Sequence, residues 1–203
     1  MTTLALNKEI ILNTAEQVLC RFGADKATVV DVAKALNISH AAVYRYFPNK
    51  AALLNAVVER WLQSIAAAMQ QVLTKDGSAS AKLLLWFETL LQLKRSKLLD
   101  EPELFALYYT LSEQAPQLVE AYTNSLLEQV TELVEEGMKR QELRPGCSQI
   151  TAAALLQAMI RFRHPAHSQF WLAPTIDQEL SGVWELIVSG LAANRSNCNK
   201  ATV

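Results

Sequence analysis

The sequence predicts an all-α protein with a small N-terminal helical head and a larger helical body. Leucine and alanine dominate, and no segment shows the alternation of β-branched and polar residues that marks a strand. Apolar residues recur instead at helical spacing, between breakers such as Lys-Asp-Gly-Ser at 75–78 and Arg-Pro-Gly at 144–146. With 203 residues, of which 51% are hydrophobic, the chain is long enough to bury a sizeable core.

The expected helices follow one another along the whole chain. The first should run from about residue 7 to 22 and end at Gly23, because glycine is common just beyond a helix C-terminus. Two short helices follow within 28–47, and a long one links head and body over 50–73. The remaining helices are expected after 78, from 101–102 through 109, from 115–116 to about 142, from 148 to about 163 with an interruption at 164–165, and from 177 to about 193.

The predicted domain organisation places the boundary inside the linking helix. Residues 1–50 form the head, together with the start of the helix at 50–73, and residues 51–193 form the body. Residues 194–203 are polar and are expected to be a disordered tail.

The most informative stretch is 28–50, which is typical of two short helices joined by a three-residue turn. Thr28 can cap the first helix, and Asp31 can return the hydrogen bond in a capping box. Asn37 tolerates the left-handed conformation that a helix C-terminus commonly needs, and Ser39 can cap the next helix. This is the pattern of a helix-turn-helix, whose second helix enters the major groove of DNA.

The second of these helices divides into an inner and an outer side. The residues expected to face inward are Ala42, Val43, Tyr46 and Phe47, and those left outside are His40, Ala41, Tyr44 and Arg45. Small side chains at 41 and 42 would let the helix lie close against another surface. Tyr46 and Phe47 are therefore predicted to serve the core rather than DNA.

The segment ISHAAVYRYFPNKAALL at 38–54 resembles the signature of the tetracycline-repressor (TetR) family of bacterial transcriptional regulators. The aromatic pair, the Phe-Pro step and the lysine fall in one fixed register, which makes the resemblance specific. Upstream, residues 10–33 fall where that family places its first two helices, so the match covers about the first 60 residues. One departure is Asn37, which stands where the family often has glycine.

The resemblance implies a set of DNA-contacting residues: Thr28, Ser39, His40, Ala41, Ala42, Tyr44, Arg45 and Lys50. Thr28 and Lys50 are expected at phosphates, where a lysine adds its charge to the N–H groups of a helix N-terminus. The Tyr44 hydroxyl can donate to a phosphate oxygen and position the helix. Arg45 can bridge guanine O6 and N7 or simply neutralise a phosphate.

Composition and charge agree with an intracellular regulator. The net charge is −1, but it is unevenly distributed. The first 60 residues hold seven Lys/Arg and five Asp/Glu, and the rest of the chain holds twelve Lys/Arg and fifteen Asp/Glu. No apolar run approaches the ~20 residues of a membrane span, and the N-terminus lacks the basic start of a secretion signal. Cys20, Cys147 and Cys198 have neither metal-site spacing nor a disulfide pattern, so we expect a cytoplasmic protein.

The aromatic residues of the body are the candidates for an effector pocket, which the family resemblance implies. The predicted lining residues are Trp86, Phe87, Phe105, Tyr108, Tyr109 and Tyr122. Aromatic-lined cavities between helices commonly hold apolar or flat ligands, so a small apolar or aromatic molecule is the expected effector. For any single aromatic, ordinary core packing is the alternative.

The last two long helices carry apolar stripes, and in the family the corresponding pair forms a four-helix dimer interface. The predicted interface residues are Ile150, Ala153, Ala154, Gln157, Leu180, Val183, Trp184 and Ile187. The alternative is that both stripes serve only the core of their own subunit. A homodimer also follows from the DNA side, because one recognition helix reads few base pairs.

Metal, cofactor and catalytic sites are not expected. His164 and His167 lie three apart, but Pro165 stands between them and no further ligands follow at recognisable spacing. No Gly-rich phosphate loop and no triad-like group is present, so the chain is not expected to be an enzyme.

The sequence therefore indicates a homodimeric repressor that binds a palindromic operator and is released by a small-molecule effector. The alternative is a helical protein-interaction module that has lost DNA binding. Intact Thr28, Tyr44 and Lys50 favour the regulator.

Overall fold

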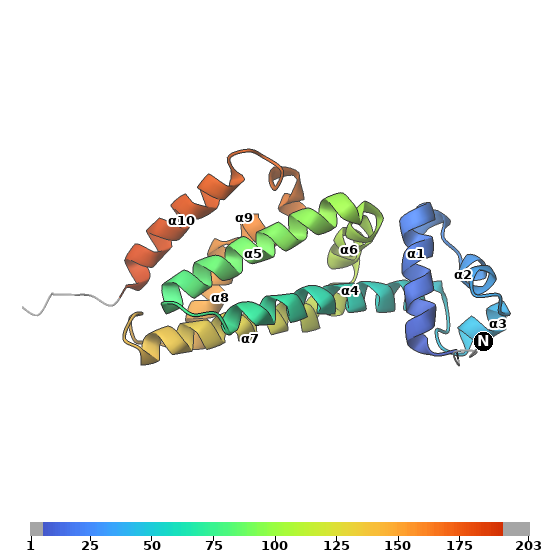
Figure 1. The fold of residues 1–203 in the computed structure, drawn as a ribbon, viewed down its shortest axis with the longest axis horizontal. Helices are drawn as coiled ribbons and strands as arrows, with labels where there is room; N and C mark the ends of the chain where they lie inside the picture. Colours follow the sequence, from blue (N-terminus) through green and yellow to red (C-terminus); the bar gives the residue numbers. More distant parts are fainter. Residues whose placement is uncertain (1–5, 193–203) are drawn as a thin grey trace, which may run out of the picture. The chain divides into compact units, whose positions relative to one another are not determined.

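The computed structural model describes residues 6–192, and within them the structure is helical (Figure 1). The only other regular pairing among these residues is one isolated β-bridge between Leu143 and Ala192. The all-α prediction is confirmed. The expected tail at 194–203, with Cys198, lies outside the described residues.

Eleven helices are present in the described part of the chain. They are α1 (Lys8–Lys26), α2 (Val29–Ala35), α3 (His40–Tyr44), α4 (Lys50–Leu73), α5 (Ala79–Asp100), α6 (Pro102–Gln114), α7 (Pro116–Lys139), α8 (Ser148–Ala158), α9 (Ile160–Arg163), the 3-10 helix η1 (Pro165–Phe170) and α10 (Ile176–Leu191). The interruption expected at 164–165 is present, since Pro165 opens η1. The helix expected from 148 to about 163 is additionally divided at Met159, where ψ is 16°.

The first helix breaks at Gly23, as expected, but the chain then adds one more helical turn before Lys26. Gly23 has φ +75° and ψ 161°, a backbone conformation that residues with a Cβ rarely adopt. A Cβ at this position would also come within 2.8 Å of a Glu103 carboxylate oxygen. Glycine is thus required here both by the turn and by the approach of α6.

The chain forms two compact units that do not follow its linear order. Unit 1 comprises residues up to Ile65 together with Ser96–Tyr122, and unit 2 comprises Ala66–Arg95 together with the chain from Thr123 onward. The boundary after Ile65 does fall inside the linking helix α4. Unit 1 also includes α6, and the expected division into domains at 1–50 and 51–193 stays a prediction.

Unit 1 groups α6 with the head because α1 packs against it. The buried side of α1 consists of Ile11, Ala15, Val18 and Leu19. Trp61 of α4 is buried in the same unit, and its indole N–H donates to Glu101 Oε2 at 2.5 Å. Glu101 also pairs with Lys97 Nζ at 2.5 Å, so one carboxylate joins α4 to the end of α5.

Unit 2 is held together by polar groups inside its core. The Gln129 side chain of α7 accepts from the Trp86 indole N–H at 3.0 Å and donates to the Ala66 carbonyl at 2.9 Å. Lys82 of α5, also buried, meets Glu136 of α7 at 2.6 Å. These contacts link α4, α5 and α7. None of the described helices combines the length and the apolar character needed to cross a bilayer.

Candidate nucleic-acid interface

The capping box predicted at the start of α2 is confirmed. The Asp31 backbone N–H donates to Thr28 Oγ1 at 3.2 Å, and the Thr28 backbone N–H donates to Asp31 Oδ2 at 3.0 Å. The Thr28 hydroxyl itself donates to the same carboxylate at 2.5 Å, and this bond lowers the pKa of Asp31. The hydroxyl proton is thus used inside the cap, and Thr28 would have to release Asp31 in order to donate to a phosphate.

The turn between α2 and α3 has the left-handed residue that the sequence predicted. Asn37 has φ +54°, and its backbone N–H donates to the Lys34 carbonyl at 3.0 Å. The Ile38 N–H donates to the Ala33 carbonyl at 3.0 Å, which completes a Schellman motif. Ser39 then caps α3 by accepting from the Ala42 N–H at 3.3 Å. The turn therefore closes with asparagine in the position that glycine usually takes.

Helix α3 presents one exposed side to solvent. Its exposed residues are His40, Ala41, Tyr44 and Arg45, with Ser39 at the cap. The His40 and Tyr44 rings meet edge to face at 6.2 Å, which steadies both on the same side. Ala42 is only 7% exposed, so its side chain packs inside the head together with Val43. The inward placement expected for Ala42 from helical spacing is confirmed, and the DNA contact that the family resemblance implied for it stays a prediction.

The residues after α3 anchor it to the head. The Tyr46 hydroxyl donates to the Leu6 carbonyl at 2.7 Å, and Phe47 is buried, so the prediction that the pair serves the core is confirmed. The Asn49 side chain accepts from the Ala52 N–H at 2.8 Å and caps α4. The cap at Asn49 was not among the predicted features, although an asparagine before a helical run is a usual cap signal.

Lys50 lies in the first turn of α4 and reaches toward the end of α1. Its Nζ donates to the Asp25 carbonyl at 3.1 Å. An ammonium group has three donors, so this bond leaves capacity for a phosphate oxygen. The contact holds a positive charge beside the N-terminal turns of α2 and α4, where backbone N–H groups also favour an anion.

The six aromatic residues predicted for an effector pocket fall in different units. Trp86 and Phe87 lie in unit 2, whereas the other four belong to unit 1. In unit 2, Phe87 meets Trp86 at 5.1 Å and Trp184 at 6.1 Å between ring centroids. In unit 1, Tyr108 lies 5.5 Å from Trp61. Phe105 and Tyr122 are buried in this unit, and Tyr109 is partly exposed.

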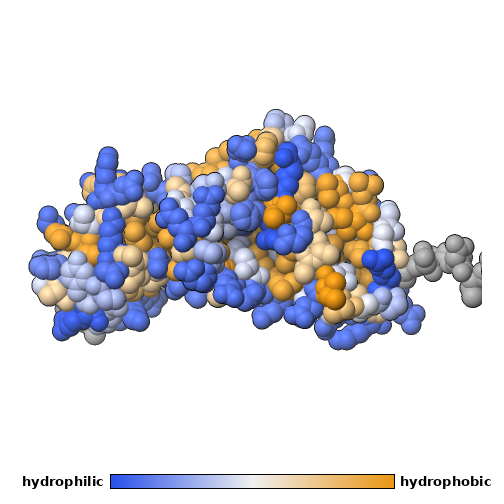
Figure 2. Space-filling view, turned by 180° about the vertical axis from the view of Figure 1, so that it is seen from behind, coloured by the Kyte–Doolittle hydropathy of each residue, from blue (hydrophilic) through white to orange (hydrophobic). Residues whose placement is uncertain are grey.

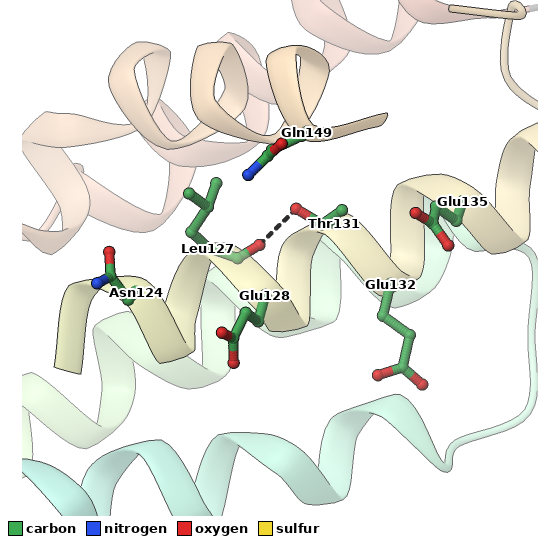
Figure 3. Close-up of a pocket in the computed structure, with 7 residues that line it drawn as sticks. All are labelled: Asn124, Leu127, Glu128, Thr131, Glu132, Glu135 and Gln149. Atoms are coloured by element: carbon green, nitrogen blue, oxygen red, sulfur yellow. Dashed lines mark hydrogen bonds between the residues drawn. The ribbon is translucent and has the colours of Figure 1, made fainter. Parts of the chain in front are cut away.

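A cavity of about 490 Å³ in unit 2 is lined by none of these aromatics. Its lining residues are Asn124, Leu127, Glu128, Thr131, Glu132, Glu135 and Gln149. Figure 3 shows that α7 supplies all but Gln149, which reaches toward it from α8. The Thr131 hydroxyl is already used, since it donates to the Leu127 carbonyl at 2.7 Å. This polar, acidic groove was missed because three glutamates along a helix normally indicate a solvated face.

The predicted interface residues divide into an outer and an inner set. Ile150 is 71% exposed, and Ala153, Ala154 and Gln157 are exposed with it on α8. On α10, Val183 and Ile187 are half-buried, but Leu180 and Trp184 pack inside unit 2, which corrects their expected role.

Leu186, also on α10, has 78% of its surface exposed. It lies between Gly182 and Gly190, and there is open space beside both glycines. Figure 2 shows that apolar patches interrupt the polar surface on one side of the molecule.

The histidines near η1 have local structural roles. His164 Nδ1 accepts from the Ala166 N–H at 3.3 Å and caps η1. His167 lies 6.4 Å from His164 and 6.4 Å from Phe170 between ring centroids.

Comparison with known proteins agrees with the geometry of the head. Residues 11–57 match the family model described as bacterial regulatory proteins, tetR family, and residues 79–184 match the tetracyclin repressor-like C-terminal domain. The chain is 25% identical over 191 residues to the uncharacterized HTH-type transcriptional regulator YhgD of Bacillus subtilis (strain 168), covering 92% of this chain and 97% of that protein. It is 23% identical over 192 residues to the nucleoid occlusion factor SlmA of Marinomonas sp. (strain MWYL1), covering 91% and 94%.

Among solved structures, the transcriptional regulator FadR from Bacillus subtilis, in complex with stearoyl-CoA, has the same fold. The TM-score is 0.65 at 18% sequence identity, and the match covers 91% of this chain and 99% of that one. The two family models together span both the helix-turn-helix and most of the helices that follow it. The chain belongs to the TetR family and is a DNA-binding transcriptional regulator.

Proposed function

We propose that this protein is a repressor that binds a palindromic operator as a homodimer and is released by a small-molecule effector. The observation that carries the DNA half of this proposal is the exposed side of α3. His40, Tyr44 and Arg45 stand outward from a helix whose other side is buried and whose ends are capped. Lys50 supplies a charge at the adjoining helix N-terminus. Phosphate contacts would position this surface, and Arg45 is the residue best suited to read a base.

The homodimer is supported by the apolar residues left exposed on α8 and α10. Ile150 and Leu186 are large and strongly exposed, and an exposed apolar patch on a protein surface commonly marks an interaction site. The alanines of α8 and the two glycines beside Leu186 would permit close approach of a partner helix. A second copy that offers the same face would bury both sets in an isologous contact.

The effector is supported by family membership and by the interior of unit 2. FadR of Bacillus subtilis has this fold in complex with stearoyl-CoA, which supports an apolar ligand for this chain as well. The aromatic contacts among Trp86, Phe87 and Trp184 give unit 2 a suitable apolar interior. The exposed thiols of Cys20 and Cys147 fit a reducing cytoplasm as the place of action.

The mechanism would be a population shift. Operator DNA favours dimers whose α3 helices have the separation of two half-sites, and the effector favours another arrangement. The coupling is reciprocal, so operator must weaken effector binding by the same factor by which effector weakens operator binding.

Selection of bound duplexes from a random DNA library tests this function. Purified wild-type protein and the Arg45→Ala variant are compared at one near-physiological salt concentration, because affinity for DNA depends steeply on salt. We expect the wild type to enrich an inverted repeat and the variant to lose the preference at one position of each half-site. Retention that is blind to sequence would contradict the proposal and favour an interaction protein that no longer reads bases.

A further inference from the structure

The acidic groove of unit 2, which is the cavity of about 490 Å³ lined by α7 and by Gln149 of α8, holds carboxylates that the described residues do not balance. Figure 3 shows Glu128, Glu132 and Glu135 in a row along α7. Glu135 has partners, because it accepts from the Ser148 hydroxyl at 3.0 Å and lies 3.7 Å from Lys139 Nζ. In the described part of the chain, Glu128 and Glu132 are exposed and form no ion pair.

Glu136, on the same helix, shows the contrasting case of a glutamate that the protein balances. It meets Lys82 Nζ at 2.6 Å and Arg140 at 3.2 Å, and the hydrogen bond from Lys82 lowers the pKa of Glu136. Exposed carboxylates without such partners give the groove a negative potential that attracts cations. Water alone can satisfy exposed carboxylates, so a specific occupant requires a basic segment that is held close to the groove.

The segment at 193–203 is basic. It contains Arg195 and Lys200, and it contains no Asp or Glu. The segment lies outside the described residues, so its own conformation does not enter the argument. Its charge is opposite to that of the groove, and it belongs to the same unit of the chain.

The structure does place the residue from which this segment continues. The Arg144 backbone N–H donates to the Leu191 carbonyl at 2.9 Å, and Leu143 forms the isolated β-bridge with Ala192. These contacts hold the end of α10 against the connection between α7 and α8. The segment after Ala192 therefore starts beside the connection that joins the two helices lining the groove.

The segment is long enough to cover the row of carboxylates. An extended chain advances about 3.3 Å per residue, which puts Arg195 up to about 10 Å from Ala192 and Lys200 up to about 16 Å farther. The row from Glu128 to Glu135 spans about 10 Å along the axis of α7. Both cations can therefore reach the groove at the same time.

We propose that residues 193–203 dock in the acidic groove of their own subunit, where Arg195 faces Glu132 and Lys200 faces Glu128. Exposed ion pairs are individually weak, but the covalent link to α10 gives the segment a high effective concentration at the groove. Because the paired charges are exposed, the contact should weaken as salt concentration rises. This inference goes beyond the proposed function and does not involve DNA.

Cys198 lies inside the segment and allows its position to be trapped by a disulfide. Cys20→Ser and Cys147→Ser first remove the two exposed thiols, and Thr131→Cys then places a thiol in the groove. Leu85→Cys, at an exposed site on α5, is the control. Oxidised glutathione is added to the full-length protein, and mass spectrometry of peptides follows each disulfide. We expect Thr131→Cys to join Cys198 roughly 10-fold faster than Leu85→Cys does, after correction for the reactivity of each thiol toward glutathione. Equal rates would overturn the proposal.

Charge reversal on each side tests the pairing itself. In the Thr131→Cys protein, Arg195→Glu with Lys200→Glu should slow the trapping roughly 3-fold to 10-fold, because two exposed ion pairs are lost. Glu128→Lys with Glu132→Lys should slow it by a similar factor, and the combination of all four substitutions should restore the rate. A rate that stays unchanged in either reversal, or that does not recover in the combination, would overturn the pairing.

A matched control separates this pairing from a general change of charge. Glu88→Lys reverses an exposed glutamate of α5 outside the groove and should leave the trapping rate unchanged. Circular dichroism checks that each variant folds. Raising the salt from about 0.05 M to about 0.5 M should slow the trapping in the protein with the native segment, since exposed charges are then screened. A rate that is insensitive to salt would overturn the role of charge.

The competing occupant of the groove is the same segment of a second copy. Gln149 of the groove precedes Ile150 of the proposed dimer face, so the segment of a partner would also start near this position. Electrophoresis without reductant distinguishes the two, because a disulfide within one chain keeps the mass of a monomer and a disulfide between chains doubles it. We expect the former, and a predominance of linked dimers would overturn the assignment to the same subunit.

Discussion

The head and unit 2 handle their polar side chains in opposite ways. In the head, the buried residues are apolar, and the groups suited to DNA stand at the surface of α3 or at helix caps. In the described part of the chain, all three buried polar residues, Lys82, Lys94 and Gln129, lie in unit 2. A surface that binds phosphate and base edges needs exposed donors, whereas recognition of a small molecule needs polar groups placed inside an apolar interior.

From this difference we expect the two regions to tolerate substitution differently. Exposed donors can be removed with little effect on folding, so head variants should lose DNA affinity and keep stability. Interior polar groups contribute to packing and to recognition together, so unit 2 variants need matched controls. The following substitutions test the contrast, from the largest expected effect to the smallest.

Leu186→Arg should have the largest effect, because a charge would replace the most exposed large apolar residue of α10. We expect the dimer to dissociate and operator affinity to fall on the order of 100-fold, since two linked half-sites then become single contacts. Sedimentation and operator titration measure the two effects. Leu85→Arg, at an exposed site on α5, is the control and should stay dimeric. A Leu186→Arg protein that remains dimeric would exclude this face as the interface.

Arg45→Ala should weaken operator binding by roughly 10-fold to 100-fold, the usual cost of one lost bidentate base contact. The loss should fall on one base pair of each half-site, which competition with single-base operator variants reveals. An equal loss on every sequence would show that Arg45 contacts phosphate. Thermal stability should be unchanged, because Arg45 is exposed at the end of α3.

Lys50→Ala should weaken binding to all sequences alike and should reduce the salt slope by about one per head. Within the protein, the Lys50 Nζ donates to the Asp25 backbone carbonyl at an exposed position. The fold should therefore tolerate the loss of this one hydrogen bond. Lys139→Ala removes an equal charge from the surface of α7 and serves as the control. A salt slope identical to that of the wild type would remove Lys50 from the phosphate contacts.

Lys94 should make stability depend on pH in alkaline solution. The pKa of Lys94 is about 7 in the folded protein, against 10.5 for an ordinary lysine, so the unfolded chain binds more protons between these pH values. Stability from this group therefore rises with pH from about 7 to 10.5, and below 7 the penalty of the buried charge is fully present. Urea unfolding at pH 7 and pH 9 should show a smaller rise for Lys94→Met than for the wild type. Lys94→Met should also be the more stable of the two at pH 7.

Asn37→Gly should have the smallest effect, a gain in stability of at most ~1 kcal/mol, because glycine adopts a positive φ without steric cost. Gln141→Gly is the matched substitution in unit 2, at φ +59°. Thermal unfolding of both variants measures the two gains. A loss of stability in Asn37→Gly would mean that the asparagine side chain contributes to the turn beyond its backbone conformation.

The sequence by itself determined the local features of this protein. The capping box at Thr28, the left-handed Asn37, the cap at Ser39 and the break at Gly23 follow from residues within a few positions of one another. The outward side of α3 and the inward placement of Ala42 were likewise predictable from helical spacing. Helix periodicity and caps act over one or two turns, so they can be read from the order of residues alone.

Only the tertiary structure decided which distant residues meet. It placed α6 with the head through Gly23 and Glu103, and it divided the predicted pocket aromatics between two units. It also buried Lys94 beside Trp171, which lies 77 positions later in the chain, and it paired Lys82 with Glu136. Burial and charge pairing depend on contacts between residues far apart in sequence, and a helical stripe of apolar residues does not reveal what will cover it.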